Sequence, residues 1–109
     1  MDTENRQHAR LSVEGIEVYD PATDTYIGSV HNMTPFGLQF ACEKELPEGH
    51  FHQIELRWEE AMDGKTRMPF DALSIWCEVI QSRMYCGVKI LAQAEDIAFL
   101  EKLVVAHSL

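Results

Sequence analysis

Apolar and polar residues alternate along most of this chain, and a period of two residues predicts β-strands. Turn-forming segments rich in Asp, Pro, Thr and Gly separate the alternating stretches from one another. The alternation changes phase at Gly15, where a glycine tolerates the backbone of a β-bulge. The predicted strands cover residues 11–19, 26–30, 38–42, 53–58, 70–80 and 84–91.

The same alternation predicts which side chains face the interior. In three strands the expected buried residues are Leu38, Phe40 and Cys42, then Ile54, Leu56 and Trp58, then Cys86, Val88 and Ile90. The longest run divides into a predicted buried face and an outer face. The buried face holds Leu73, Ile75, Cys77 and Val79, and the outer face holds Ser74, Trp76 and Glu78.

A hairpin turn centred on Gln81 and Ser82 is expected to join the last two strands. That register pairs apolar residues on the buried face: Cys77 with Cys86, Ile75 with Val88, and Leu73 with Ile90. Because a small barrel buries one face of each strand, Trp76 is expected to point outward. An outward indole needs a cover. The expected cover is the C-terminal helix, the region around Trp58, or a stacked base.

The last segment changes from a period of two to helical spacing. Apolar residues at helical spacing, Ile97, Leu100, Leu103 and Val104, predict a helix at about 95–107. Glu95 and Asp96 lie in its first turn, where acidic groups favour the helix dipole. Six strands followed by one amphipathic helix predict an all-β protein, a six-stranded antiparallel barrel with a C-terminal α-helix packed on it.

Length and charge limit the classes of partner. A chain of 109 residues forms one domain, which we assign to residues 11–109, and residues 1–10 lack an apolar period and are expected to form a flexible arm. The formal net charge of −9 disfavours nucleic-acid polymers and anionic membrane surfaces. No apolar run is long enough to span a bilayer and no signal peptide is evident, which favours a cytoplasmic location.

The spacing of the cysteines and histidines offers little support for a disulfide bond or a metal site. Cys42, Cys77 and Cys86 are an odd set without C-x-x-C spacing, so they are expected to be reduced core thiols. His50 and His52 lack a third ligand at a convincing spacing, and no metal site or cofactor is predicted. P-loop, H-E-x-x-H and G-x-S-x-G patterns are absent from the sequence, so no catalytic activity is predicted.

Two short motifs point to an anionic ligand that also carries bases. Arg6 and Arg10, four positions apart, offer guanidinium groups that match phosphates and can lie on a purine. Asn32, Thr34 and Gly37 supply an amide, a hydroxyl and a position for close backbone approach. Each motif also has a structural interpretation: a solvated tail for the arginines, and an ordinary loop at 32–37 between two strands.

Taken in this order and separation, the motifs resemble those of the PilZ domain family. That family carries Arg-x-x-x-Arg, then, after a strand pair, Asp/Asn-x-Ser-x-x-Gly; the late strands around Trp76 and Gly87 are also similar. The resemblance covers nearly the whole chain. This chain departs from the family pattern at Thr34, which replaces the usual serine, and at Pro35, which follows it.

The resemblance implies that the protein binds cyclic di-GMP. It implies that Arg6 and Arg10 contact guanine and phosphate, and that Asn32 and Thr34 contact the ligand from the barrel side. Trp76 is similar in place to a tryptophan of PilZ members, which favours a role at the site. The expected function is a receptor whose arm orders on the ligand and signals to a protein partner. The alternatives are an adaptor that no longer binds the nucleotide and a small barrel enzyme acting on a nucleotide.

Overall fold

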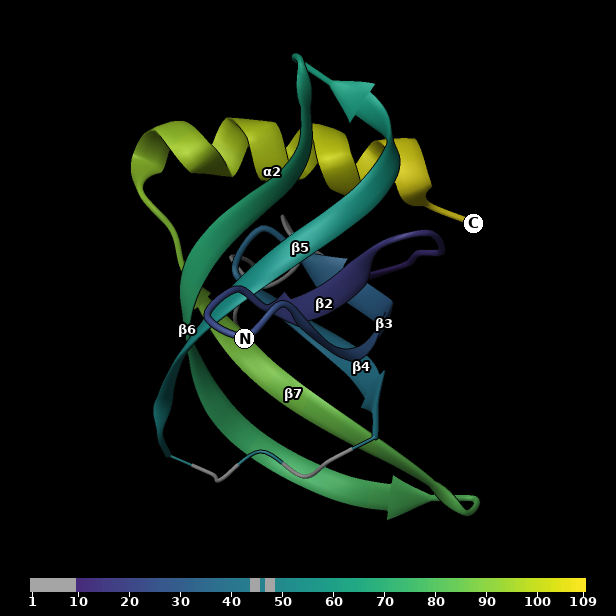
Figure 1. Ribbon diagram of the computed structural model, residues 1–109. Coiled ribbons are helices and arrows are strands. Elements are labelled where there is room, and N and C mark those ends of the chain that lie inside the picture. Colours follow the sequence, from purple (N-terminus) through teal and green to yellow (C-terminus); the bar gives the residue numbers. More distant parts are fainter. Residues whose placement is uncertain (1–9, 44–45, 47–48) are drawn as a thin grey trace, which may run out of the picture.

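The computed structural model describes residues 10–43, 46 and 49–109. Seven strands and one helix make up this part of the chain (Figure 1). They are β1 (Leu11–Ser12), β2 (Glu17–Asp20), β3 (Thr25–Thr34), β4 (Gly37–Cys42), β5 (Phe51–Met62), β6 (Lys65–Ile80), β7 (Arg83–Leu91) and α2 (Ala94–His107).

Six of the strands close into an antiparallel barrel. The order around the barrel is β2-β5-β6-β7-β4-β3, and β3 closes it because it pairs with both β4 and β2. The two-residue strand β1 pairs with the far end of β3, where Leu11 lies opposite Met33. The predicted six-stranded antiparallel barrel with one C-terminal helix is therefore confirmed.

The first predicted strand is divided into two at its glycine. Gly15 has a φ of +91°, and the chain between β1 and β2 leaves the regular pairing there. Both halves still pair with β3 along the same edge, and Val13 and Ile16 on either side of the break are both buried. The change of phase that the sequence shows at Gly15 is thus a break between two short strands.

Helix α2 lies across one end of the barrel (Figure 1). Its buried residues are Phe99, Leu100, Leu103 and Val104. The ring centroids of Phe99 and Trp58 are 5.7 Å apart, so the helix is packed against β5. The amide of Leu109 also donates to the carbonyl of Ser12 at 2.9 Å, which ties the chain after the helix to β1. The predicted helix is confirmed, with Phe99 as an additional buried residue.

The predicted buried face of β6 is wrong at Val79, which is 64% exposed near the end of the strand, and over the first part of the strand. Met68, Phe70, Ala72 and Ser74 are buried there, whereas Ile75 is 52% exposed. The pairing with β7 shifts by one residue between Ser74 and Trp76, so Ile75 is an extra residue on β6. Of the three predicted pairs, Cys77 with Cys86 is confirmed. The other two are wrong, because Val88 lies opposite Ser74 and Ile90 lies opposite Ala72.

The cysteines are not three separate reduced thiols. Cys77 and Cys86 form a disulfide between β6 and β7, with Cα atoms 4.2 Å apart, which contradicts the expected reduced state. The third cysteine, Cys42 on β4, lies beside this pair. Sequence spacing hides the bond because cysteines nine residues apart form no recognised motif, and it is the hairpin register that brings them together.

Burial along α2 gives a test of how the helix is held. Leu103→Ala removes a fully buried side chain and should lower the free energy of unfolding by about 2–5 kcal/mol. Val105→Ala, on the exposed side of the same helix, should change it by less than about 0.5 kcal/mol. Urea unfolding of both variants measures the difference. Equal effects would contradict the packing of α2 on the barrel.

Candidate ligand-binding face

Four residues of the outer barrel surface form one row across four neighbouring strands. Asn32 on β3 lies opposite Gln39 on β4, and Gln39 lies opposite Gly87 on β7. Gly87 in turn lies opposite Trp76 on β6. We call Asn32, Gln39, Gly87 and Trp76 the outer row. The strand register therefore brings two of the predicted ligand-binding residues, Asn32 and Trp76, to one face of the barrel.

The amide of Asn32 has an unfilled acceptor. Its Nδ2 donates to Oε1 of Gln39 at 3.0 Å, which joins the first two members of the outer row. Its Oδ1 is buried and has no hydrogen-bond partner among the described residues. A buried acceptor without a donor costs free energy, so a ligand or an arginine that donates to this amide would be favoured.

The second motif lies on strands and not, as predicted, on a loop at 32–37. Asn32 and Thr34 belong to the end of β3, Gly37 begins β4, and Pro35 and Phe36 alone form the turn between them. The Thr34 hydroxyl accepts from the Phe36 amide at 3.0 Å, which stabilises this turn. Thr34 is 9% exposed, so its hydroxyl supports the turn at the edge of the face.

Gly37 is required by close strand packing. A Cβ at this position would lie 3.0 Å from the Val88 carbonyl oxygen of β7. The glycine thus allows β4 to approach β7 at the point where Gly37 lies opposite Lys89. Its role here is structural, and it brings an exposed lysine next to the motif.

Arg10 lies at the same end of β3 as the motif. It precedes Leu11, which pairs with Met33, so the register carries the chain toward the level of Thr34. Arg10 is exposed, and its guanidinium is accessible to a ligand. Arg6 and most of the predicted arm lie outside the described residues.

Trp76 covers a glycine on the outer surface. Cys86 and Val88 on either side of Gly87 point inward, so Gly87 presents its backbone outward. A Cβ on Gly87 would overlap the Trp76 indole, which shows that the ring lies directly over this glycine. The predicted outward direction of Trp76 is confirmed. The expected cover for Trp76 included the helix and the region around Trp58. Trp58 instead packs beside Phe99 of the helix, and the inner side of the Trp76 ring lies on the backbone of β7 at Gly87.

Two other residues of this face, Gln39 and Lys89, were not singled out from the sequence. Gln39 enters the outer row through its bond to Asn32, and Lys89 adds an exposed cation on β7. His31 and Tyr85 contribute a tilted ring pair with centroids 5.7 Å apart. A lone glutamine or lysine in a strand carries no functional signal in sequence, so these residues could be found only through the register of the strands.

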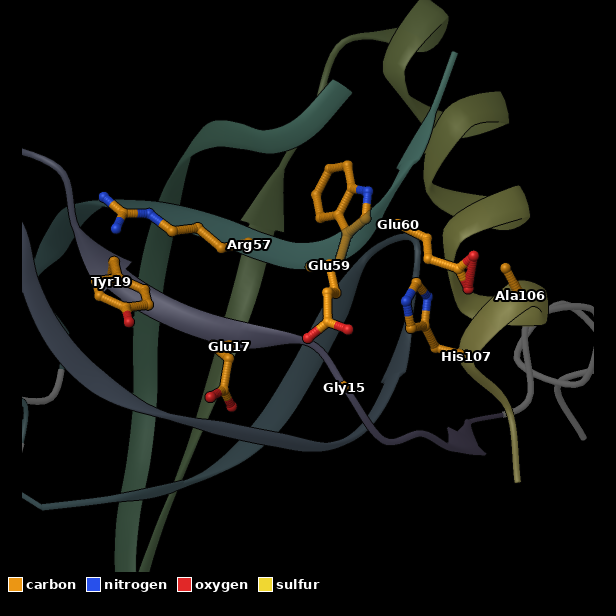
Figure 2. Close-up of a pocket in the computed structure, with 9 residues that line it drawn as sticks. Gly15, Glu17, Tyr19, Arg57, Glu59, Glu60, Ala106 and His107 are labelled. Carbon is orange, nitrogen blue, oxygen red and sulfur yellow. The ribbon is translucent and has the colours of Figure 1, made fainter. Parts of the chain in front are cut away.

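A concave region lies between β2, β5 and the end of α2, away from the outer row. It is a cavity of about 580 Å³ with Glu17, Tyr19, Arg57, Glu60 and His107 among its lining residues. Figure 2 shows strand side chains on one side of this cavity and His107 from the helix end on the other. Its carboxylates make it unsuitable for a phosphate ligand, in contrast to the outer row.

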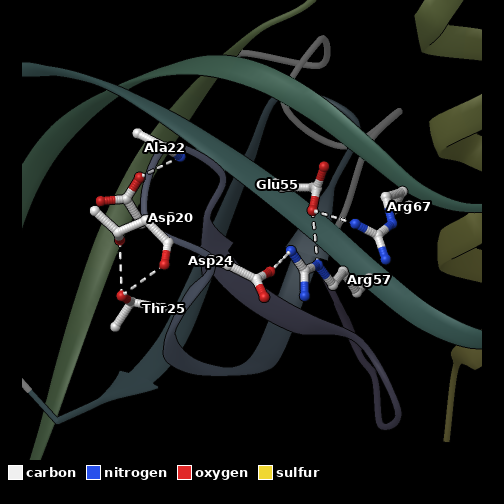
Figure 3. Close-up of polar contacts among 8 residues, drawn as sticks. Asp20, Ala22, Asp24, Thr25, Glu55, Arg57 and Arg67 are labelled. Atoms are coloured by element: carbon white, nitrogen blue, oxygen red, sulfur yellow. Dashed lines mark hydrogen bonds and ion pairs between the residues drawn. The ribbon is translucent and has the colours of Figure 1, made fainter.

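The arginine beside this cavity is fully engaged in the fold. Arg57 donates to Asp24 at 2.5 Å and to Glu55 at 2.6 Å (Figure 3). Its guanidinium also lies 3.8 Å from the centroid of the Tyr19 ring. The hydrogen bond and charge of Arg57 lower the pKa of Asp24, and the same two carboxylates raise the pKa of Arg57. Arg57 is therefore a structural cation that holds the turn before β3 against β5.

Histidine and carboxylate groups in the described part of the chain do not converge on a metal site. No group of three side chains suited to metal coordination occurs among these residues. The rings of His50 and His52 stack with centroids 6.5 Å apart. The same residues contain no helix with the length and apolar character of a membrane span.

The contact between Gly87 and Trp76 is testable by a double-mutant cycle. Gly87→Ala should force the indole to move and lower the free energy of unfolding by about 1–3 kcal/mol, the usual cost of overpacking. In a Trp76→Ala background the same change should cost little, because the overlapping ring is gone. Urea unfolding of the four proteins gives the coupling. A cost that is unchanged in the Trp76→Ala background would show that the ring lies elsewhere.

The lowered pKa of Asp24 gives a pH-dependent prediction. The Arg57 contact stabilises the fold above the ordinary Asp pKa of 3.8, and this contribution is lost as the pH falls through the lowered value. Asp24→Asn should make the acid-side loss of stability shallower, as measured by urea unfolding between about pH 5 and 2. The matched control is Asp63→Asn, whose carboxylate is 3.7 Å from the Lys102 ammonium. An equal change in both variants would refute a special role for Asp24.

Comparison with known proteins gives matches at the level of structure. No family model and no curated protein sequence matches the chain. The PilZ domain of YcgR from Escherichia coli, solved with c-di-GMP (cyclic di-GMP), matches with a TM-score of 0.71 at 16% identity, covering 94% of this chain and 90% of that one. MotI/DgrA, an inhibitor of motility from Bacillus subtilis, matches with a TM-score of 0.68 at 13% identity, covering 93% of this chain and 50% of that one.

A third match extends the comparison to another organism. PlzA from Borreliella burgdorferi, solved in complex with c-di-GMP, has a TM-score of 0.57 at 12% identity, covering 94% of this chain and 53% of that one. The chain thus spans about half the length of the MotI/DgrA and PlzA chains. Nearly all of it is matched by the YcgR domain. From its barrel, its C-terminal helix and these matches, the chain has the PilZ domain fold.

Proposed function

We propose that this protein is a receptor for cyclic di-GMP, without catalytic activity of its own. Two observations support the ligand class. The fold is that of a PilZ domain, and two of the matched structures, those of YcgR and PlzA, hold c-di-GMP. The chain also retains two arginines four positions apart and an Asn-x-Thr-x-x-Gly segment.

The observation that carries the proposal is the convergence of three separate segments on one face. Arg10 leads into β1 beside the end of β3, Asn32 lies in the outer row, and Trp76 ends that row on β6. Asn32 and Trp76 are far apart in sequence and are brought to one surface by the strand register, and Arg10 lies two residues before Ser12, which pairs with Asn32. Such a set combines cationic, polar and aromatic groups, which a dianionic ligand with two purines requires.

Each group has a distinct task in this proposal. The guanidinium of Arg10 pairs with a phosphate in a two-point contact or lies flat on a guanine, and Arg6 is proposed to do the same from the arm. The Asn32 amide, with its unfilled buried acceptor, receives hydrogen bonds from a guanine edge or from an arginine that the ligand orders. Trp76 offers an aromatic surface, and Lys89 adds positive charge nearby.

The proposal includes a change in the N-terminal arm. Binding orders the arm over the outer row, because the ligand provides the phosphates that its arginines otherwise lack. The ordered arm then presents a new surface to a protein partner in the cytoplasm. This sequence of events makes the protein a signalling receptor that acts through association.

Calorimetric titration with cyclic di-GMP tests the proposal directly. The parent protein should bind, and Arg6→Ala or Arg10→Ala should weaken binding by about 2–3 kcal/mol each, the scale of charged hydrogen bonds. Asn32→Ala should cost about 1–2 kcal/mol because its bonds are largely neutral. The matched control is Arg83→Ala, at the exposed turn of the β6–β7 hairpin, which should bind like the parent.

Two results would contradict this assignment. If the parent protein does not bind cyclic di-GMP, the alternative of an adaptor that acts without the nucleotide is favoured. If binding occurs but Arg83→Ala weakens it as much as Arg10→Ala, the ligand lies on another part of the barrel. Urea unfolding of each variant serves as a check that the fold is retained.

A further inference from the structure

The three cysteines gather at one point of the barrel wall. They come from three strands: Cys42 from β4, Cys77 from β6 and Cys86 from β7. Cys77 and Cys86 form a disulfide, and the Sγ atom of Cys42 lies 2.9 Å from the Sγ atom of Cys86. The distance between these two sulfurs exceeds the length of a disulfide bond by less than about 1 Å. Cys86 is therefore the central sulfur of a set of three.

The three sulfurs differ in their access to solvent. Cys86 is fully buried and Cys42 is 8% exposed, whereas Cys77 is half-buried on β6. A thiol at Cys77 can therefore meet an external reagent more readily than a thiol at Cys42. The position of the disulfide within the set determines which of these two thiols is present.

Cys42 and Cys77 each have a backbone carbonyl in position to accept a hydrogen bond from an S–H group. The Cys42 thiol donates to the Met84 carbonyl at 3.7 Å. The Sγ atom of Cys77 lies 3.4 Å from the Leu46 carbonyl, which can accept a hydrogen bond from Cys77 when that residue is a thiol. The protein thus has a hydrogen-bond acceptor ready for the thiol on either side of Cys86.

We propose that Cys42, Cys77 and Cys86 form a thiol–disulfide exchange site. The Cys42 thiol loses its proton to solvent, and the resulting thiolate attacks the Sγ atom of Cys86. The Cys42–Cys86 bond forms as the Cys77–Cys86 bond breaks, and Cys77 leaves as a thiolate that takes up a proton. No electrons are gained or lost in this step. Exchange moves the reactive thiol from the barrel interior to half-buried Cys77.

This site is separate from the proposed nucleotide contacts, yet it lies directly beside them. Cys77 follows Trp76 in β6, and Cys86 precedes Gly87 in β7, so the bond that moves is next to one end of the outer row. The exchange proposal does not depend on nucleotide binding. Its test can therefore succeed or fail independently of the calorimetric titration.

Peptide mapping of the full chain can detect the exchange. Trypsin cleaves after Arg10, Lys44, Arg67, Arg83 and Lys89, so the three cysteines fall in separate peptides, residues 11–44, 68–83 and 84–89. The protein is oxidised with oxidised glutathione and treated with iodoacetamide under native conditions at about pH 8, near the ordinary thiol pKa. Remaining thiols are then blocked with N-ethylmaleimide in denaturant before digestion, which prevents later rearrangement.

The proposal predicts iodoacetamide label on Cys77, although this residue is in the disulfide of the structure. The labelled fraction should carry a cross-link between peptides 11–44 and 84–89, because alkylation of Cys77 traps the exchanged form. Label on Cys42 alone, with an intact Cys77–Cys86 cross-link and no label on Cys77, would show a disulfide that does not exchange and would overturn the proposal. Absence of label from both residues, or of any cross-link after oxidation, would also overturn it.

Two variants make the result specific to the set of three. Cys42→Ser removes the attacking thiol at nearly constant volume, so Cys77 should remain cross-linked to Cys86 and should lose its label. Cys77→Ser leaves Cys42 and Cys86, which should form their own cross-link on oxidation because their sulfurs are already in contact. A Cys77→Ser protein that stays fully reduced while the parent oxidises would contradict exchange. Urea unfolding confirms that each variant is folded.

Discussion

A single extra residue in the pairing of β6 with β7 determines what this part of the barrel exposes. Before Ile75 the even-numbered residues of β6 point inward, and after it Cys77 points inward opposite Cys86. If the pairing continued without the shift, Trp76 would lie opposite Cys86 and its indole would compete for space in the core. The bulge moves the indole to the outer surface and brings two cysteines together inside.

The barrel separates its charges between two outer regions. On the β2–β5 side, Arg57 is held by Asp24, Glu55 and the Tyr19 ring, so its charge is already neutralised by the fold. The outer row has amides, a glycine and an indole, with Arg10 and Lys89 at its borders. A chain with a formal charge of −9 can therefore keep a local surface that suits a small anion, because exposed charges are screened beyond roughly 8–10 Å.

Sequence periodicity predicted the strands and the helix because the pattern that marks each element lies in residues that are near neighbours along the chain. It failed where a contact between strands decides the outcome. Ile75 has no glycine or proline to mark a bulge, so the buried face of early β6 was assigned wrongly. Turn chemistry around Pro35 was correctly placed but too wide, since a two-residue turn is enough. The disulfide was missed although the register of its two cysteines was predicted, because register alone does not determine oxidation state.

The contact between Trp76 and Gly87 also has an evolutionary consequence. These positions are eleven residues apart in sequence and are coupled through one surface, because any side chain at 87 occupies the space of the indole at 76. Among chains that share this fold, the two positions should therefore covary. A large aromatic residue at position 76 should occur with glycine at position 87, and a smaller residue at position 76 should allow other side chains at position 87. Single substitutions that reach one combination from the other pass through a disfavoured pair, and the order in which the two changes occur is constrained.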